Sequence, residues 1–143
     1  MKMRSLILVL LLHLSSPAEA GELVVVVNAA SGAGQLSRDQ VINIFLGRFR
    51  QFPSGLTAEP IDQPEDGPLR AQFYRLLVDK QMTEINAYWA RLIFSGRTSP
   101  PLKAKSSDEV LRLLSSRRGG IAYMNKSEVN HLLTIVFTPN HDQ

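Results

Sequence analysis

The sequence contains no cysteine, and only three histidines and one tryptophan occur among its 143 residues. Without cysteine the chain forms no disulfide, offers no thiolate for catalysis or metal binding, and has no thiol for the lipid of a lipoprotein. No HExxH motif or similar histidine pairing is present, which argues against a zinc site. We therefore expect no metal, no cofactor and no lipid anchor.

Motifs for nucleotide, hydrolase and nucleic-acid chemistry are missing as well. The chain has no G-x-S-x-G elbow and no GK[ST] ending of a phosphate loop. Its basic residues are scattered, and apart from Arg117 and Arg118 none are adjacent, so there is no basic patch typical of nucleic-acid binding. These absences favour a protein that is not an enzyme and has no nucleic-acid partner.

No apolar run reaches the roughly 20 residues of a membrane-spanning helix. The longest, Leu6–Leu12, follows Lys2 and Arg4 and precedes the Ala18-Glu19-Ala20 sequence. A positive start, a short apolar stretch and an A-x-A site are typical of a cleaved secretory signal. We predict a signal peptide over residues 1–20 and a periplasmic domain over 21–143; a membrane anchor is the weaker alternative.

Strand and helix patterns alternate along residues 21–143. The continuous apolar run after Glu22 is typical of a strand buried on both faces. Helices separate most of the later strands, which indicates an α/β fold with a mixed, mostly parallel sheet flanked by helices. Strands are expected over residues 22–27, 58–62, 121–124 and 132–137, and helices after Ser37, from Pro68, around Ile85 and after Ser106.

The helix ends carry recognisable signals. Ser37 and Gln40 have the spacing of a capping box, and Gly47 suits the C-terminal end of the same helix. Pro68 suits the first turn of the second helix. The third helix should end at Gly96, with a buried face formed by Ile85, Tyr88, Trp89, Leu92 and Ile93.

Two segments invite a chemical interpretation, and each keeps an alternative. Ser31-Gly32-Ala33-Gly34 between a strand and a helix could cradle an anion with backbone N–H groups, or be a flexible turn. The carboxylates of Asp62, Glu65 and Asp66 could serve acid–base chemistry in an extracytoplasmic hydrolase, or simply favour a helix start.

Taken in order, several segments resemble the substrate-binding protein family of phosphate ABC transporters, specifically its short, single-lobe members. The first is Leu36-Ser37 followed by Ile44-Phe45-Leu46-Gly47, similar to that family's "L-S…I-F-L-G" helix. The others are Val25–Asn28, Phe52–Gly55, Arg70–Tyr74, Tyr88–Gly96 and Gly120–Tyr123. Together they cover nearly all of residues 21–143.

The resemblance implies one lobe of a type II periplasmic-binding-protein fold and recognition of phosphate or a related oxyanion. The ligand-binding candidates, all at strand-to-helix junctions, are Ser31, Gly32, Gly34, Gln63, Gly67 and Arg70. Family receptors carry an Arg-x-Asp-x-Ser-Gly-Thr segment where this chain reads Asp62–Arg70, without the first arginine or the hydroxyls.

We therefore expect a periplasmic solute-binding-type protein of phosphate transport that binds its ligand weakly or has lost it. An ABC permease or another envelope protein is the expected partner. The alternative is an envelope interaction or sensor module on the same fold, with a homodimer as one form.

Overall fold

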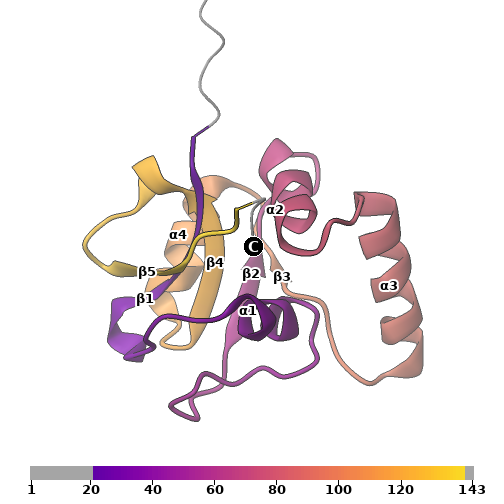
Figure 1. The fold of residues 1–143 in the computed structure, drawn as a ribbon, viewed down its shortest axis with the longest axis horizontal. Coiled ribbons are helices and arrows are strands. Elements are labelled where there is room, and N and C mark those ends of the chain that lie inside the picture. Colours follow the sequence, from indigo (N-terminus) through magenta and orange to yellow (C-terminus); the bar gives the residue numbers. More distant parts are fainter. Residues whose placement is uncertain (1–20, 141–143) are drawn as a thin grey trace, which may run out of the picture.

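The computed structural model describes residues 21–140, in which a five-stranded sheet carries helices on both faces (Figure 1). The strands and α-helices are β1 Leu23–Asn28, α1 Arg38–Phe45, β2 Glu59–Asp62, α2 Pro68–Val78, α3 Met82–Ser95, β3 Leu102–Lys103, α4 Ser107–Ser116, β4 Gly120–Asn125 and β5 Leu133–Phe137. Two short 3-10 helices, Ala29–Ser31 and Lys126–Glu128, follow β1 and β4. The expected signal peptide, residues 1–20, lies outside the described residues. Within these residues, no helix has the length and apolar character needed to cross a membrane.

The sheet is mixed, with the strand order β3-β2-β4-β1-β5. Strand β2 pairs in parallel with β3 and β4, whereas β1 pairs antiparallel with β4 and β5. The predicted α/β class with a mixed sheet flanked by helices is confirmed. The expectation of a mostly parallel sheet is wrong, because β1 pairs antiparallel with both neighbours and parallel pairing is confined to the β3-β2-β4 half. The apolar run of β1 reflects its central place in the sheet, which demands burial whatever the direction of its neighbours.

Strand β1 divides the hydrophobic core into two layers. Val25 and Val27 pack on the side of α1, α2 and α3, while Val24 and Val26 pack on the side of α4. In Figure 1, α1 lies in front of the sheet and α4 behind it. Because each of these valines is buried, each contributes roughly 1.5–3 kcal/mol relative to an exposed side chain.

Helix α1 begins and ends where its sequence predicts. The Ser37 hydroxyl accepts a hydrogen bond from the Gln40 N–H at 3.2 Å, and the Ser37 N–H donates to the Gln40 side chain at 2.8 Å. Gly47 follows the helix with a φ of 70°. A Cβ at this position would lie 2.7 Å from Oγ1 of Thr98 and 3.0 Å from Trp89. Glycine is therefore required both by the backbone and by the close approach of α3 and the loop after it.

The other helix boundaries also follow the predicted signals. Pro68 is the first residue of α2, Gly96 ends α3 with a φ of 68°, and the Ser106 hydroxyl accepts from the Glu109 N–H at 3.1 Å to cap α4. Strand β3 was not predicted. It has two residues after a proline-rich loop, and it exists only because it pairs with β2.

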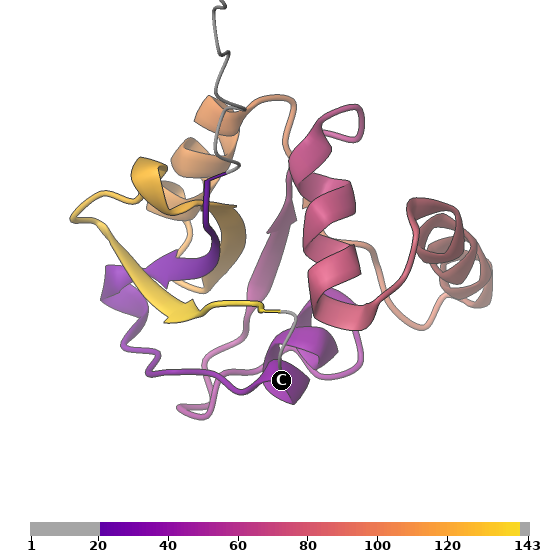
Figure 2. The ribbon, with the colours of Figure 1, turned by 45° about the horizontal axis from the view of Figure 1, so that its top comes forward.

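The predicted buried face of α3 is too wide. Ile85 and Trp89 are buried and Tyr88 and Leu92 are partly buried, but Ile93 is 56% exposed. Figures 1 and 2 both show α3 beyond α2, away from the sheet, so it contacts the rest of the molecule along a narrow stripe. A helix packed on one side only buries a smaller part of its circumference than an equally apolar helix in the core.

Candidate functional site

Buried polar residues gather where β2 meets α2. Among the described residues the buried polar or charged ones are Ser31, Asp62, Gln63 and Arg70, and the last three belong to this junction. Asp62 is the final residue of β2, and Arg70 lies in the first turn of α2. Because burying charges without partners is costly, this concentration is the strongest candidate for a functional site.

The Asp62 carboxylate accepts hydrogen bonds from three side chains. The Tyr123 hydroxyl donates at 2.5 Å, the Tyr74 hydroxyl at 3.1 Å and Arg70 Nε at 3.2 Å. Gln63 joins them, because its N–H donates to the Tyr123 hydroxyl at 3.2 Å and its side-chain amide to the Tyr123 carbonyl at 2.8 Å. We call these five residues the Asp62 cluster; it links β2, β4 and α2.

Arg70 is held on three sides within the protein. Besides the ion pair with Asp62, its Nη1 donates to Asn86 Oδ1 of α3 at 3.4 Å, and its guanidinium lies 5.7 Å from the centre of the Tyr74 ring. Among the described residues no acceptor contacts its remaining nitrogen, Nη2. The arginine therefore keeps the N–H groups of Nη2 free for another acceptor, while its charge is already balanced by Asp62.

Burial dominates the electrostatics of the cluster. It raises the pKa of Asp62, although hydrogen bonds from Tyr123 and the charge of Arg70 act in the opposite direction. Burial and the nearby carboxylate raise the pKa values of Tyr74 and Tyr123 well above that of a free tyrosine. Both hydroxyls therefore stay protonated at neutral pH and act as donors to Asp62. The Gln63 Oε1 atom is buried and has no hydrogen-bond partner within residues 21–140.

The N-terminus of α2 offers little to an anion. Pro68 has no N–H to donate, and the residue before it, Gly67, provides no side-chain cap. In the same loop Glu65 is exposed and pairs with Lys103 of β3, which lowers the pKa of the glutamate. The acidic cluster Asp62, Glu65 and Asp66 is thus divided, with Asp62 buried and Glu65 and Asp66 exposed. Residues 21–140 contain no group of three or more ligating side chains that could hold a metal ion.

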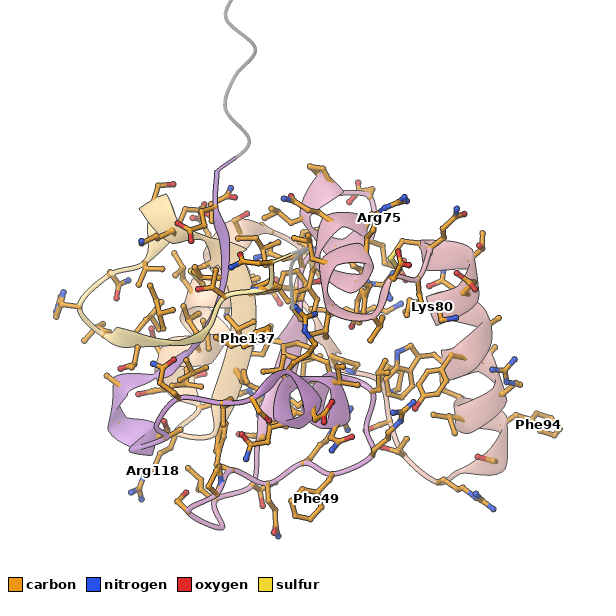
Figure 3. The ribbon with its side chains drawn as sticks, in the orientation of Figure 1. Phe49, Arg75, Lys80, Phe94, Arg118 and Phe137 are labelled. Atoms are coloured by element: carbon orange, nitrogen blue, oxygen red, sulfur yellow. The ribbon has the colours of Figure 1, made fainter. Side chains whose placement is uncertain are left out.

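The structure does not bring all six predicted ligand residues together. Gln63, Gly67 and Arg70 lie at the β2–α2 junction, but Ser31, Gly32 and Gly34 follow β1, which runs antiparallel to β4 and hence to β2. The glycine-rich turn therefore lies at the opposite edge of the sheet, where Arg118 Nε donates to the Ala30 carbonyl at 3.2 Å. Figure 3 shows Arg118 at that end of the molecule.

Sequence reasoning missed the two tyrosines as members of the site. Tyr74 lies one helical turn after Arg70, and Tyr123 is a hydroxyl-bearing residue in an otherwise apolar strand. A buried tyrosine needs a partner for its hydroxyl. The expected burial of Tyr74 and Tyr123 was therefore a signal that each hydroxyl has a partner. Asp62, the acceptor that both contact, was already among the carboxylates considered for chemistry.

No protein-family model and no curated protein sequence matches this chain. Solved structures do match. An ABC-type phosphate transport receptor from Vibrio cholerae superposes with a TM-score of 0.64 at 15% identity, covering 84% of this chain and 49% of that one. This chain therefore shares the fold of about half of that receptor.

Two more structures extend the comparison. One is a Clostridium perfringens protein described as a phosphate ABC transporter substrate-binding protein, with bound phosphate (TM-score 0.62, 11% identity, 81% of this chain, 44% of that chain). The other is a possible phosphate binding protein from Planctomyces limnophilus (0.59, 12%, 81% and 40%). The chain thus spans less than half the length of these structures, and the predicted resemblance is confirmed for the fold.

Proposed function

We propose that this protein is an exported solute-binding-type domain of a phosphate or related oxyanion ABC transport system, and that alone it binds the free oxyanion weakly. The observation that carries this is Arg70, which is buried at the strand-to-helix junction. Its Nη2 donors have no acceptor among the described residues, and its charge is neutralised by Asp62. The receptor-like fold supports the ligand class. The proposed contacts are Arg70, Gln63 and Gly67. The other three candidates, Ser31, Gly32 and Gly34, lie at the opposite edge of the sheet, and we leave them out of this proposed site.

Weak binding follows from the donors that the junction lacks. An oxyanion needs several charge-assisted hydrogen bonds, and here Asp62 already occupies Arg70 Nε and both tyrosine hydroxyls. A single lobe also leaves a ligand partly in water, where each hydrogen bond is weaker. Submicromolar phosphate binding by a monomer in calorimetry would contradict the proposal.

A thermal-shift screen against phosphate, sulfate, molybdate and a phosphonate tests the ligand class. With a dissociation constant of about 1 mM, roughly 10 mM ligand should raise the unfolding free energy by about 1.4 kcal/mol. Asp62→Asn should raise phosphate affinity about tenfold, because it releases the charge of Arg70. Glu65→Gln is the second variant: it removes an exposed charge of the same loop and should raise affinity by less, without touching the buried ion pair.

Export is tested separately. If residues 1–20 are a cleaved leader, protein recovered from the periplasmic fraction should begin at Gly21 in N-terminal sequencing. Recovery of the full-length chain from the cytoplasm would contradict this part of the proposal and leave the ligand question standing.

An envelope interaction module remains the second candidate, and the outer surface of α3 favours it. Phe94 is 95% exposed and Ile93 is 56% exposed, and Figure 3 shows Phe94 pointing away from the body of the protein. Adjacent exposed apolar side chains are typical of a docking surface. A stable dimer in light scattering that Phe94→Ser dissolves would support this candidate over solute binding.

A further inference from the structure

A concave region lies between the end of α1, the end of α2 and the face of α3 from Glu84 to Arg91. It has a volume of about 580 Å³ and none of the Asp62 cluster lines it. Pockets of roughly 300–1,000 Å³ with apolar walls are the usual binding places of small ligands. We call it the basic pocket, for the charges described below.

The walls of the basic pocket are apolar. Ile42 contributes from α1, Leu46 directly follows that helix, and Ile85 and Tyr88 contribute from α3. The Tyr88 hydroxyl donates to the Leu46 carbonyl at 2.6 Å, so its polar end is already satisfied. Ala87 has a short, exposed side chain and leaves the space open. An apolar group in this pocket would be covered by carbon without leaving a polar atom unpaired.

The rim of the basic pocket is positively charged. Arg48, Lys80 and Arg91 line it, against one carboxylate, Glu84. Glu84 lies 3.7 Å from Lys80 Nζ, whereas Arg48 and Arg91 form no ion pair with any residue in the described part of the chain. Figure 3 shows Lys80 at the gap between α2 and α3. Two unpaired arginines beside apolar walls create a positive potential that attracts an anion.

We propose that the basic pocket binds a small amphiphilic anion, a molecule with an apolar body and a carboxylate or phosphate head. The body lies against Ile42, Leu46 and Tyr88, and the head lies at the rim within reach of Arg48 and Arg91, since guanidinium groups bind both kinds of head. This site is separate from the Asp62 cluster, and it does not depend on whether the junction binds phosphate.

Calorimetry with matched probes tests the pocket. Decanoate and decyl phosphate, kept below their micelle concentrations, should bind saturably at one site. Acetate and inorganic phosphate supply the head without the body, and decyltrimethylammonium supplies the body with the opposite charge; all three should bind at least tenfold more weakly, or not at all. Equal binding of the cationic probe would overturn the proposal.

Variants locate the binding. The double variant Arg48→Gln/Arg91→Gln should weaken decanoate binding roughly tenfold, because each exposed ion pair with the head group contributes up to about fivefold in affinity. Ala87→Trp should abolish it by filling the pocket. Arg112→Gln on α4, an exposed arginine outside the pocket, is the control and should leave affinity unchanged. Unchanged affinity in both pocket variants, or binding of an acidic helical peptide with no binding of either amphiphile, would overturn the proposal.

Discussion

The Asp62 cluster and the basic pocket use their positive charges in opposite ways. In the cluster, Arg70 is buried against a carboxylate and two hydroxyls, so its charge is balanced before any ligand arrives. In the pocket, Arg48 and Arg91 are exposed and have no carboxylate partner among the described residues. The strand-to-helix junction, where folds of this class are expected to bind a ligand, is thus neutralised from within, while cations without a carboxylate partner among the described residues lie elsewhere on the surface.

The largest loss of stability should follow removal of Arg70, the cation of the Asp62 cluster. Arg70→Ala leaves Asp62 buried without its charge partner, and we expect it to lower the unfolding free energy by about 3–5 kcal/mol at neutral pH. Chemical denaturation measures the loss. Arg75→Ala, an exposed position on the same helix, should change stability by no more than about 0.5 kcal/mol.

The pH dependence of this variant checks the cause. Without Arg70 the pKa of Asp62 should rise further above its unfolded value, because burial already raises it and the opposing charge is gone. Stability then falls as the pH rises from the ordinary aspartate pKa through the raised one. The difference in unfolding free energy between the protein and Arg70→Ala should therefore become smaller towards acid pH. A difference that stays constant with pH would mean that it comes from lost packing.

The next largest effect should come from a single hydroxyl. Tyr123→Phe removes a donor to Asp62 and the acceptor of the Gln63 N–H, and should cost about 1–3 kcal/mol because buried groups lose their partners. Tyr88→Phe is the matched control: its hydroxyl bonds one carbonyl in a partly exposed place, so the loss should be smaller. Equal losses of unfolding free energy in the two variants would mean that the buried Asp62 cluster is no more sensitive to a lost hydroxyl than the wall of the basic pocket.

Alkaline titration probes the cluster without a mutation. Because the pKa values of Tyr74 and Tyr123 are raised well above those of the unfolded chain, the unfolded state releases these protons first and stability falls as the pH rises above about 10. Tyrosinate absorbance should show these two residues ionising only together with unfolding. Ionisation of all three tyrosines in the folded state would contradict the burial argument.

The smallest effect on stability should come from the exposed end of α3. Phe94→Ser should change the unfolding free energy by no more than about 0.5 kcal/mol, because the ring is almost fully exposed. Its solubility should rise, since an apolar contact surface is removed. A large loss of stability would mean that Phe94 packs against something in solution.

Local signals in the sequence predicted most of the helix ends. Ser37, Pro68 and Ser106 act within one turn of the chain, so their neighbours decide the outcome. The grouping of the site residues was less predictable. Whether Ser31 lies beside Arg70 depends on the direction of β1, and that direction is set by pairing with strands about a hundred residues later.

The meeting of side chains from different elements in the Asp62 cluster could not be predicted from neighbouring residues in the sequence either. Tyr74 and Tyr123 meet Asp62 from a helix and from a neighbouring strand, and nothing near either tyrosine in the sequence indicates the partner. The exposure of Ile93 has the same origin. Its periodicity is that of a wide buried face, but only the packing of α3 beside α2 decides how much of that face is covered.

The position of β1 in the sheet has a consequence for how the protein folds. Val25 pairs with Tyr123 on one side and with Phe137 on the other, so the first strand of the described chain finds both neighbours among the last strands. Contacts of such long range must wait for synthesis of the whole chain, and they slow folding. During synthesis the valine-rich strand stays unpaired, and we expect a chain truncated before β4 to aggregate through it.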